Sequence, residues 1–367
     1  MSSLRFTRAH VLLDGTVADA PLSIDGTRIA ERGSREIDLS GCILAPGIVD
    51  VHGDAFDRHL SPRRGLLPHP REGLPMLAAE LAACGITTAY LAQFWSWEGG
   101  MRGPDFARAL SQGLADWKGP VDLRMQLRVE THMIADFNAI ARFVRAQGID
   151  YVSFNDHLPH AALTGGVRPE RITGAALRAR RAPQAHWALM RQLHGNASRV
   201  PTALAQLIAE LPPVALASHD DDVERRETFA AMGVRIAEFP TALDAVGRNA
   251  VMGAPNVVRG GSHGRGVAAS EVIAQGACQA LASDYHYPAP LRAVRRLVAE
   301  GTPLPAAWKL VSQGPATLLG LTDRGSLEIG RRADLVILDA GDLSHLGTFA
   351  AGVPVWLHPC LAVRMIG

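Results

Sequence analysis

Metal-binding and acid–base side chains recur along this chain where short apolar runs end. His52-Gly53-Asp54 follows one such run and Glu130 closes another. Three further runs end in Asn155-Asp156-His157, His219-Asp220 and Asp284. A lone histidine in such a place is more often structural than a metal ligand. Three histidines and three carboxylates after five different runs favour a shared site instead.

This mixture of imidazole and carboxylate suits one or two divalent ions. Both groups bind zinc, manganese or iron, and a carboxylate can bridge two ions. Because alternate residues of an extended strand share a face, His52 and Asp54 can reach the same ion. A bound ion lowers the pKa of its water to about 7 and so supplies a hydroxide nucleophile. A neighbouring carboxylate that is not shared can accept the proton.

Short apolar runs alternate with helix-like stretches through the middle of the chain and would position these groups. The predicted strands are residues 47–52, 86–93, 123–130, 151–156, 214–219, 234–239, 250–253 and 279–284. Helices are predicted at 74–84, 137–147 and 271–275. This alternation is typical of a parallel (β/α)₈ barrel, in which catalytic groups lie at the C-terminal strand ends. The candidate ligands would therefore meet at one mouth of the barrel.

The two ends of the chain have a different sequence pattern, in which short apolar runs alternate with turn residues. Such runs are residues 9–15, 22–26, 36–41, 325–330 and 333–339. They predict strands of a small antiparallel sheet built from both ends. We therefore expect an α/β chain with a TIM-type barrel at 46–322. A small β-sandwich-like domain would combine residues 1–45 and 323–367.

The composition of the 367 residues fits a globular enzyme, with 47% apolar and 20% charged residues. A net charge of +1 gives no basic field for nucleic acid or an anionic membrane. No apolar stretch approaches the roughly 18 residues of a membrane span, and Met1–His10 lacks a signal-peptide pattern. The scattered Cys42, Cys84, Cys278 and Cys360 favour free thiols. We expect a cytoplasmic protein, with a homo-oligomer as one open possibility.

The segment from Leu44 to Asp54 resembles the first-strand signature of the amidohydrolase superfamily, whose usual motif is His-x-His. Here Asp54 takes the place of the second histidine, which restricts the resemblance to fewer families of that superfamily. Residues 217–221, 236–241, 252–263 and 283–285 are also similar to one family within it, the diphosphatases of the carbon–phosphorus lyase pathway. The resemblance covers nearly the whole chain, and its 252–263 stretch is long and specific.

The resemblance implies hydrolysis of α-D-ribose 1-methylphosphonate 5-triphosphate to the 5-phosphate and diphosphate, so the expected partner is a phosphorylated sugar. It also implies two divalent ions, with zinc expected first and manganese or iron as alternatives. The implied ligands are His52, Asp54, Glu130, His157, His219 and Asp284. Among them Glu130 is the candidate bridge and Asp284 the candidate general base.

Phosphate binding has separate candidates. Arg259, Ser262 and His263 lie in a Gly-rich loop whose N–H groups can cradle oxygens. Arg63 and Arg64 come shortly after the first metal motif. Arg128 shares a strand face with Glu130, so an interior position would indicate either an anionic partner or a structural ion pair.

Several departures from the family pattern bear on the substrate, among them the Arg/Ala-rich stretch from Arg168 to Gln184 where the family usually has a Tyr/Gln-rich segment. Asp156-His157 continues as Leu158-Pro159-His160-Ala161 where the family usually has Pro-Gly-Gln, and His286 is an added residue. Two alternatives therefore stay open. One is an amide or cyclic-imide hydrolase on the same metal centre. The other is a catalytically silent barrel that binds a phosphorylated ligand or partner proteins.

Overall fold

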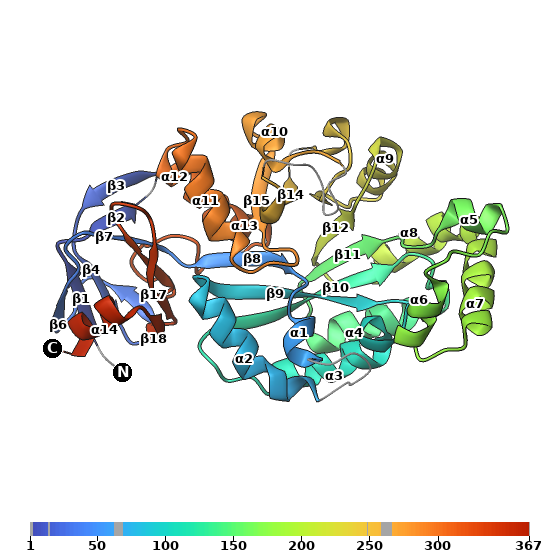
Figure 1. Cartoon of the computed structure of the whole chain (residues 1–367), viewed down its shortest axis with the longest axis horizontal. Coiled ribbons are helices and arrows are strands. Elements are labelled where there is room, and N and C mark those ends of the chain that lie inside the picture. The colour runs from blue at the N-terminus through green and yellow to red at the C-terminus, as the bar shows by residue number, and fades with distance from the viewer. Residues whose placement is uncertain (1–2, 14, 62–68, 248, 258–265, 367) are drawn as a thin grey trace.

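The central sheet of the molecule has eight parallel strands in chain order (Figure 1). The computed structural model describes residues 3–13, 15–61, 69–247, 249–257 and 266–366. The strands are β8 (Ile48–Gly53), β9 (Ile86–Trp95), β10 (Asp122–Glu130), β11 (Tyr151–Asn155), β12 (Ala215–His219), β13 (Ile236–Glu238), β14 (Ala250–Gly253) and β15 (Cys278–Ala282). All eight predicted strands are present.

The sheet curves until its two edge strands meet. The backbone N–H of Asp284, just after β15, donates to the His52 carbonyl at 2.9 Å. The N–H of Asp54 donates to the Asp284 carbonyl at 2.7 Å, and Gly53 and Asp284 form a parallel bridge. This closure confirms the predicted barrel.

Helices cover the outside of the barrel because each has one apolar face. Helix α4 buries Phe137, Ile140, Ala141 and Val144, which recur at the helical period, and ends at Gly148 in the left-handed conformation. The helices around the barrel are α1 (Asp57–Leu60), α2 (Pro70–Ala83), α3 (Pro104–Ala115), α4 (Phe137–Gln147), α8 (Val200–Glu210), α9 (Val223–Ala231), α10 (Ala269–Ala274), α11 (Ala289–Ala299), α12 (Leu304–Lys309) and α13 (Gln313–Leu318). None of the described helices is long and apolar enough to cross a membrane.

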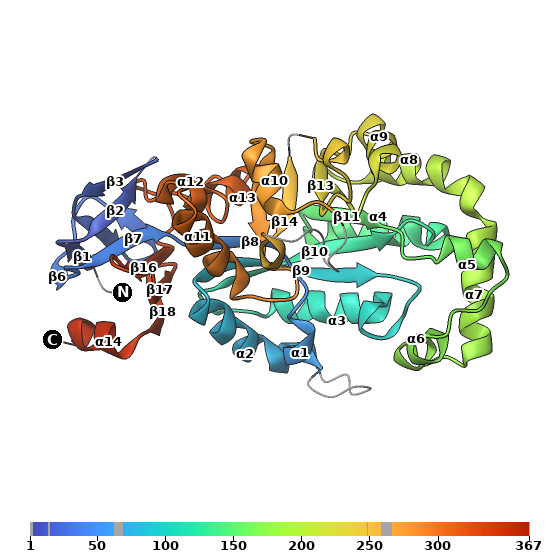
Figure 2. The same cartoon turned by 45° about the horizontal axis from the view of Figure 1, so that its top comes forward.

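A helical insert follows β11, at the end of the molecule farthest from the chain termini (Figure 2). It consists of α5 (His160–Thr164), α6 (Ile172–Arg178) and α7 (Pro183–Gly195). Leu163, Ile172 and Met190 of the insert pack with Trp97 and Leu158 in a small apolar cluster of their own. This packing holds the insert against loops that follow β9 and β11.

The barrel interior is apolar over part of its length and polar over the rest. Val49, Tyr90, Tyr151, Ala217 and Ile236 belong to an apolar layer inside it. Along β10, Leu127 and Val129 belong to the core under the helices, whereas Gln126, Arg128 and Glu130 alternate with them and face inward. The C-terminal half of the barrel is thus lined by buried polar groups.

Two further sheets make up the small domain, which contains both chain ends (Figure 1). One sheet joins β5 (Arg28–Ala30), β4 (Leu22–Asp25), β1 (Ser3–Thr7) and β6 (Arg35–Asp38). The other joins β18 (Val353–Leu357), β17 (His345–Ala350), β16 (Leu335–Asp339), β7 (Cys42–Pro46), β2 (His10–Leu13) and β3 (Thr16–Asp19). Phe6, Ile24, Leu44, Leu335 and Phe349 are buried between them. Helix α14 (Pro359–Ile366) follows.

Two expectations about this domain were wrong. It is not one antiparallel sheet, because β1 pairs with β6 and β2 pairs with β7 in parallel. Residues 325–330 are not a strand, since Gly325 and Gly330 adopt φ values of +85° and +86° that bend the backbone. The N–H of Gly330 instead donates to the Ile29 carbonyl at 2.9 Å.

A partly buried ion-pair network joins the barrel to the segment that returns to the small domain. Asp122 at the start of β10 accepts hydrogen bonds from Arg324 (2.6 Å) and Arg124 (3.0 Å). Arg324 also donates to the Thr88 hydroxyl at 2.7 Å. Burial acts to raise the pKa of Asp122, but Arg124 and Arg324 hold it below its ordinary value. All four cysteines are free thiols, as expected, and three are buried.

Candidate metal centre

Five metal-competent side chains meet at the C-terminal mouth of the barrel and form what we call the first cluster. His52 is the second-last residue of β8 and Asp54 directly follows that strand. His219 and Glu238 end β12 and β13, and Asp284 follows β15. One ligand atom from each of His52, Asp54 and Asp284 lies within 4.8 Å of the others, and the same holds for His52, His219 and Glu238. The first cluster therefore joins four strand ends.

The backbone turns sharply at three of these strand ends. Asp220, Phe239 and Asp284 have φ values of 54°, 51° and 54°, each directly or closely after its strand. A left-handed conformation is uncommon outside glycine, although aspartate tolerates it better than most residues. Non-glycine residues held in this way gather at functional sites, where packing and hydrogen bonds offset the strain.

Glu238 is the most constrained member of the first cluster. Its fully buried carboxylate accepts hydrogen bonds from Gln126, Tyr151 and, at 2.7 Å, Ser153. The Nδ1 atom of His52 lies 3.3 Å from it. Burial acts to raise the pKa of Glu238, but His52, His219 and the Tyr151 hydroxyl lower it to about 2. The same carboxylate raises the pKa of His52 above its ordinary value against the effect of burial.

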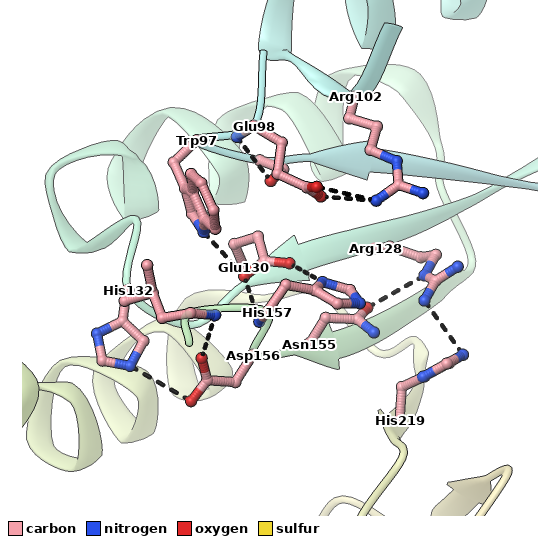
Figure 3. A network of polar contacts seen from close by, with 12 residues as sticks. Trp97, Glu98, Arg102, Arg128, Glu130, His132, Asn155, Asp156, His157 and His219 are labelled. Carbon is pink, nitrogen blue, oxygen red and sulfur yellow. Dashed lines mark hydrogen bonds and ion pairs between the residues drawn. The ribbon is translucent and has the colours of Figure 1, made fainter. Parts of the chain in front are cut away.

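The guanidinium of Arg128 lies at the centre of the first cluster, stacked over the Phe94 ring (4.0 Å to its centroid). It donates to both Asp54 oxygens at 3.1 and 3.2 Å and to Asn155 Oδ1 at 3.2 Å. The Nε2 atom of His219 lies 3.1 Å from it (Figure 3), and the Nε2 atom of His52 lies 3.4 Å from it. Arg128 thus faces the interior, in an ion pair with Asp54.

This cation changes the acidity of its neighbours. Burial raises the pKa of the Asp54 carboxyl, but Arg128 and His52 bring it below its ordinary value. Burial and then Arg128 lower the pKa of His219 to about 4, which leaves the imidazole neutral at pH 7. Neutral imidazole is the form that binds metals.

Glu98, Glu130 and His157 form a second cluster, at the C-terminal ends of β9, β10 and β11 (Figure 3). Glu130 is fully buried and hydrogen-bonds to the His157 ring. It also accepts from the His157 backbone N–H at 3.1 Å and from Trp97 Nε1 at 3.3 Å. Arg102 pairs with Glu98 at 2.8 Å and neutralises that carboxylate. The loop after β9 therefore completes this cluster.

The donor set fits divalent cations. The buried Asp284 Oδ2 has no hydrogen-bond partner among the described residues, whereas His52 Nδ1 and His219 Nδ1 lie 3.3 and 3.2 Å from the carboxylates of Glu238 and Asp220. Unpaired buried polar atoms are costly, and nitrogen and oxygen donors of this kind suit zinc, manganese or iron. Burial raises the pKa of Asp284 to about 6, with a further contribution from Asp54.

The structure separates the six expected ligands into the two clusters rather than one shell. His52, Asp54, His219 and Asp284 belong to the first, and Glu130 and His157 belong to the second. Five expected phosphate-binding residues lie outside the described residues, namely Arg63, Arg64, Arg259, Ser262 and His263.

Two cluster members were missed in the sequence. Glu238 ends β13 and is the second-last residue of the strand predicted at 234–239, so the same strand-end rule would have found it. Glu98 lies three residues past β9 in a loop, and no local pattern indicates that it faces Glu130. Trp97 and Arg102, which bond to these carboxylates, lie in the same stretch.

Comparisons with known proteins agree with this architecture. A model of the amidohydrolase family matches residues 225–348. The chain is 31% identical to the α-D-ribose 1-methylphosphonate 5-triphosphate diphosphatase of Escherichia coli (strain K12) over 362 residues. That alignment covers 90% of this chain and 94% of the relative.

Solved structures show the same fold at low sequence identity. N-acetylglucosamine-6-phosphate deacetylase from Pasteurella multocida has a TM-score of 0.63 at 12% identity, covering 97% of this chain and 100% of that one. An adenosine deaminase from Xanthomonas campestris, solved with bound zinc, has a TM-score of 0.54 at 15% identity, covering 99% and 97%. These similarities concern the fold alone.

Proposed function

Since this chain belongs to the amidohydrolase superfamily, in the family of the ribose methylphosphonate triphosphate diphosphatase, we propose that it hydrolyses a phosphoanhydride of a sugar triphosphate. The proposed substrate is α-D-ribose 1-methylphosphonate 5-triphosphate, with the 5-phosphate and diphosphate as products. The choice of substrate rests on the 31% identity to the Escherichia coli enzyme.

Divalent ions, zinc first among them, would be held by the first and second clusters. When bound, they would polarise phosphoryl oxygens and increase the acidity of a coordinated water. His52, Asp54, His219 and Asp284 would hold one ion, and Glu130 and His157 would contribute to a second. The arrangement of imidazole and carboxylate in both clusters supports this assignment.

Asp284 is the proposed general base, and one observation carries this role. Its buried Oδ2 has no hydrogen-bond partner among the described residues, so the atom is free to accept a proton from water. Burial and Asp54 raise the pKa of Asp284 to about 6. A base of that strength is largely ionised at pH 7 yet binds a proton more readily than an ordinary aspartate.

Positive charge at the mouth would stabilise the anionic substrate and the leaving diphosphate. Arg128 lies within the first cluster and Arg102 beside the second. Both guanidiniums already pair with carboxylates, so they would offset the negative charge of those carboxylates before substrate binds. Arg259, in the Gly-rich stretch, is the proposed additional contact to the polyphosphate.

The proposal is tested with purified protein supplied with zinc or manganese. Phosphorus NMR of the reaction with α-D-ribose 1-methylphosphonate 5-triphosphate should show release of diphosphate rather than phosphate. Asp284→Asn should retain its bound metal, measured by elemental analysis, while turnover falls by a factor on the order of 10² or more. Cleavage of amides or cyclic imides, with no diphosphate released, would contradict the proposed substrate.

A further inference from the structure

A third group of metal-competent side chains lies outside both clusters, where the helical insert meets the barrel. His132 follows β10 and Asp156 follows β11. His160 begins α5, and His194 lies near the end of α7. One ligand atom from each of His132, Asp156 and His160 lies within 4.8 Å of the others.

The two imidazoles approach the same carboxylate oxygen. His132 Nε2 lies 3.4 Å from Asp156 Oδ2, and His160 Nε2 lies 2.9 Å from it. Ligands of a tetrahedral ion with bonds of roughly 2.0–2.2 Å are separated by roughly 3.3–3.6 Å. The two separations from Asp156 Oδ2 are within a few tenths of an ångström of that range, and one ligand atom of each residue lies within 4.8 Å of the others.

Contacts on the far side of each ring fix which nitrogen faces this oxygen. The Nδ1 atom of His132 lies 3.3 Å from the Leu193 carbonyl, which can only accept, so Nδ1 is the protonated position. The Nδ1 atom of His160 lies 2.9 Å from His194 Nδ1. Metal-binding histidines commonly engage their second nitrogen in this way, which leaves Nε2 as the ligand atom.

The carboxylate is oriented as well. Asp156 Oδ1 accepts a hydrogen bond from the backbone N–H of Leu158 at 3.1 Å, which leaves Oδ2 directed at the two imidazoles. Figure 3 shows Asp156 extending toward His132 while the adjacent His157 turns to Glu130. The third group is therefore separate from the second cluster although the two share a stretch of chain.

The third group is accessible to solvent on one side. The side chain of His132 is 4% exposed and that of Asp156 19%, whereas that of His160 is 40% exposed. Three protein ligands with one accessible side leave a coordination position for water. Two imidazoles also argue against magnesium or calcium, which prefer oxygen ligands alone.

We propose that His132, Asp156 and His160 bind a divalent transition-metal ion of the zinc class, with His194 as a positioning residue. The ion joins the ends of two barrel strands to α5, and His194 links it to α7. Its role is to hold the helical insert against the barrel mouth. The proposal does not depend on the reaction that the first two clusters catalyse.

The test counts metal ions in the full-length protein after chelation and dialysis. Zinc is titrated in competition with a chromophoric chelator, and cobalt is titrated while its visible absorption is recorded. Because ions in the other clusters contribute equally to all variants, the difference from wild type reports the third group. His160→Gln is the main variant, since its partly exposed side chain makes a folding defect improbable.

His160→Gln should bind one equivalent fewer than wild type and lose one set of tetrahedral cobalt bands. His132→Gln should show the same loss. His194→Gln should retain the equivalent with roughly 10- to 100-fold weaker affinity, as expected for a residue that orients a ligand. His10→Gln is the matched control, because His10 lies on the small domain, where it pairs with Asp19, and it should match wild type.

Thermal unfolding of the metal-free proteins checks that each variant folds. Added zinc should raise the Tm of wild type and His10→Gln more than that of His160→Gln. Equal zinc stoichiometry and equal cobalt spectra in wild type, His160→Gln and His132→Gln would overturn the proposal. The three side chains would then be an ion-pair network that binds no metal.

Discussion

Replacing Asp284 by asparagine should stabilise the metal-free protein even though it removes the proposed base. The Asp284 side chain is buried and its Oδ2 has no hydrogen-bond partner among the described residues, so ionising it in the folded state is unfavourable. Asparagine has nearly the same shape and tolerates the left-handed φ of 54°. The backbone bonds to His52 and Asp54 are unaffected by the change.

The size of the effect follows from the raised pKa. Burial brings the pKa of Asp284 from 3.8 to about 6. Each tenfold change in the acid constant corresponds to about 1.4 kcal/mol, so the ionised carboxylate costs about 3 kcal/mol of folding free energy. Because the folded protein binds the proton more tightly than the unfolded chain, wild type loses stability as the pH rises from about 4 to 6. Above that range the full cost remains.

Urea denaturation in the presence of a chelator, followed by circular dichroism, measures this difference at several pH values. The free-energy gap between Asp284→Asn and wild type should grow from pH 4 to 6 and then stay constant. Asp220→Asn is a matched control with the same substitution and the same φ. Burial acts to raise the pKa of Asp220, but His219 lowers it to about 2, so this variant should be destabilised. A destabilised or pH-independent Asp284→Asn would refute the reasoning.

Two further predictions concern substrate affinity and the link between the domains. Arg259→Ala should raise the KM for a triphosphorylated sugar by about ten- to a hundredfold, because a charge-assisted contact is worth roughly 1.5–3 kcal/mol; steady-state kinetics with unchanged values would remove Arg259 from polyphosphate binding. Asp122→Asn should lower the free energy of unfolding by about 2 kcal/mol at neutral pH, because Arg124 and Arg324 lose their ionised acceptor. The loss is limited to this value because Arg324 keeps its bonds to Asp323 and Thr88. The lowered pKa of Asp122 means that this contribution is complete above about pH 4 and is lost as the pH falls further, so urea midpoints of variant and wild type should converge in acid.

The barrel was predictable because short apolar runs alternate with helix-like stretches along the chain and end in polar residues. The predicted strand at 250–253 coincides with β14, and the predicted helix at 137–147 coincides with α4. Strand ends were less accurate where the backbone turns. The strand predicted at 234–239 is only Ile236–Glu238, and it ends before Phe239 because that residue adopts a positive φ that no sequence pattern indicates.

The division of the expected ligands between two clusters was not predictable from the sequence. Strand-end positions indicate which residues reach the mouth, but side-chain conformations decide which of them meet. The Arg128 guanidinium occupies the centre of the first cluster, and Glu130 turns to His157 instead. Glu98 reaches the second cluster from a loop, where residue spacing carries no information about direction.

The six-stranded sheet has a consequence for synthesis on the ribosome. Strand β7 pairs with β2 on one edge and with β16 on the other, and about 290 residues lie between Pro46 and Leu335. At about 5–20 residues per second, the open edge of β7 waits roughly 15–60 s for its partner. During that interval its unpaired N–H and C=O groups can bind another nascent chain. The last strands translated therefore shield the first ones from aggregation.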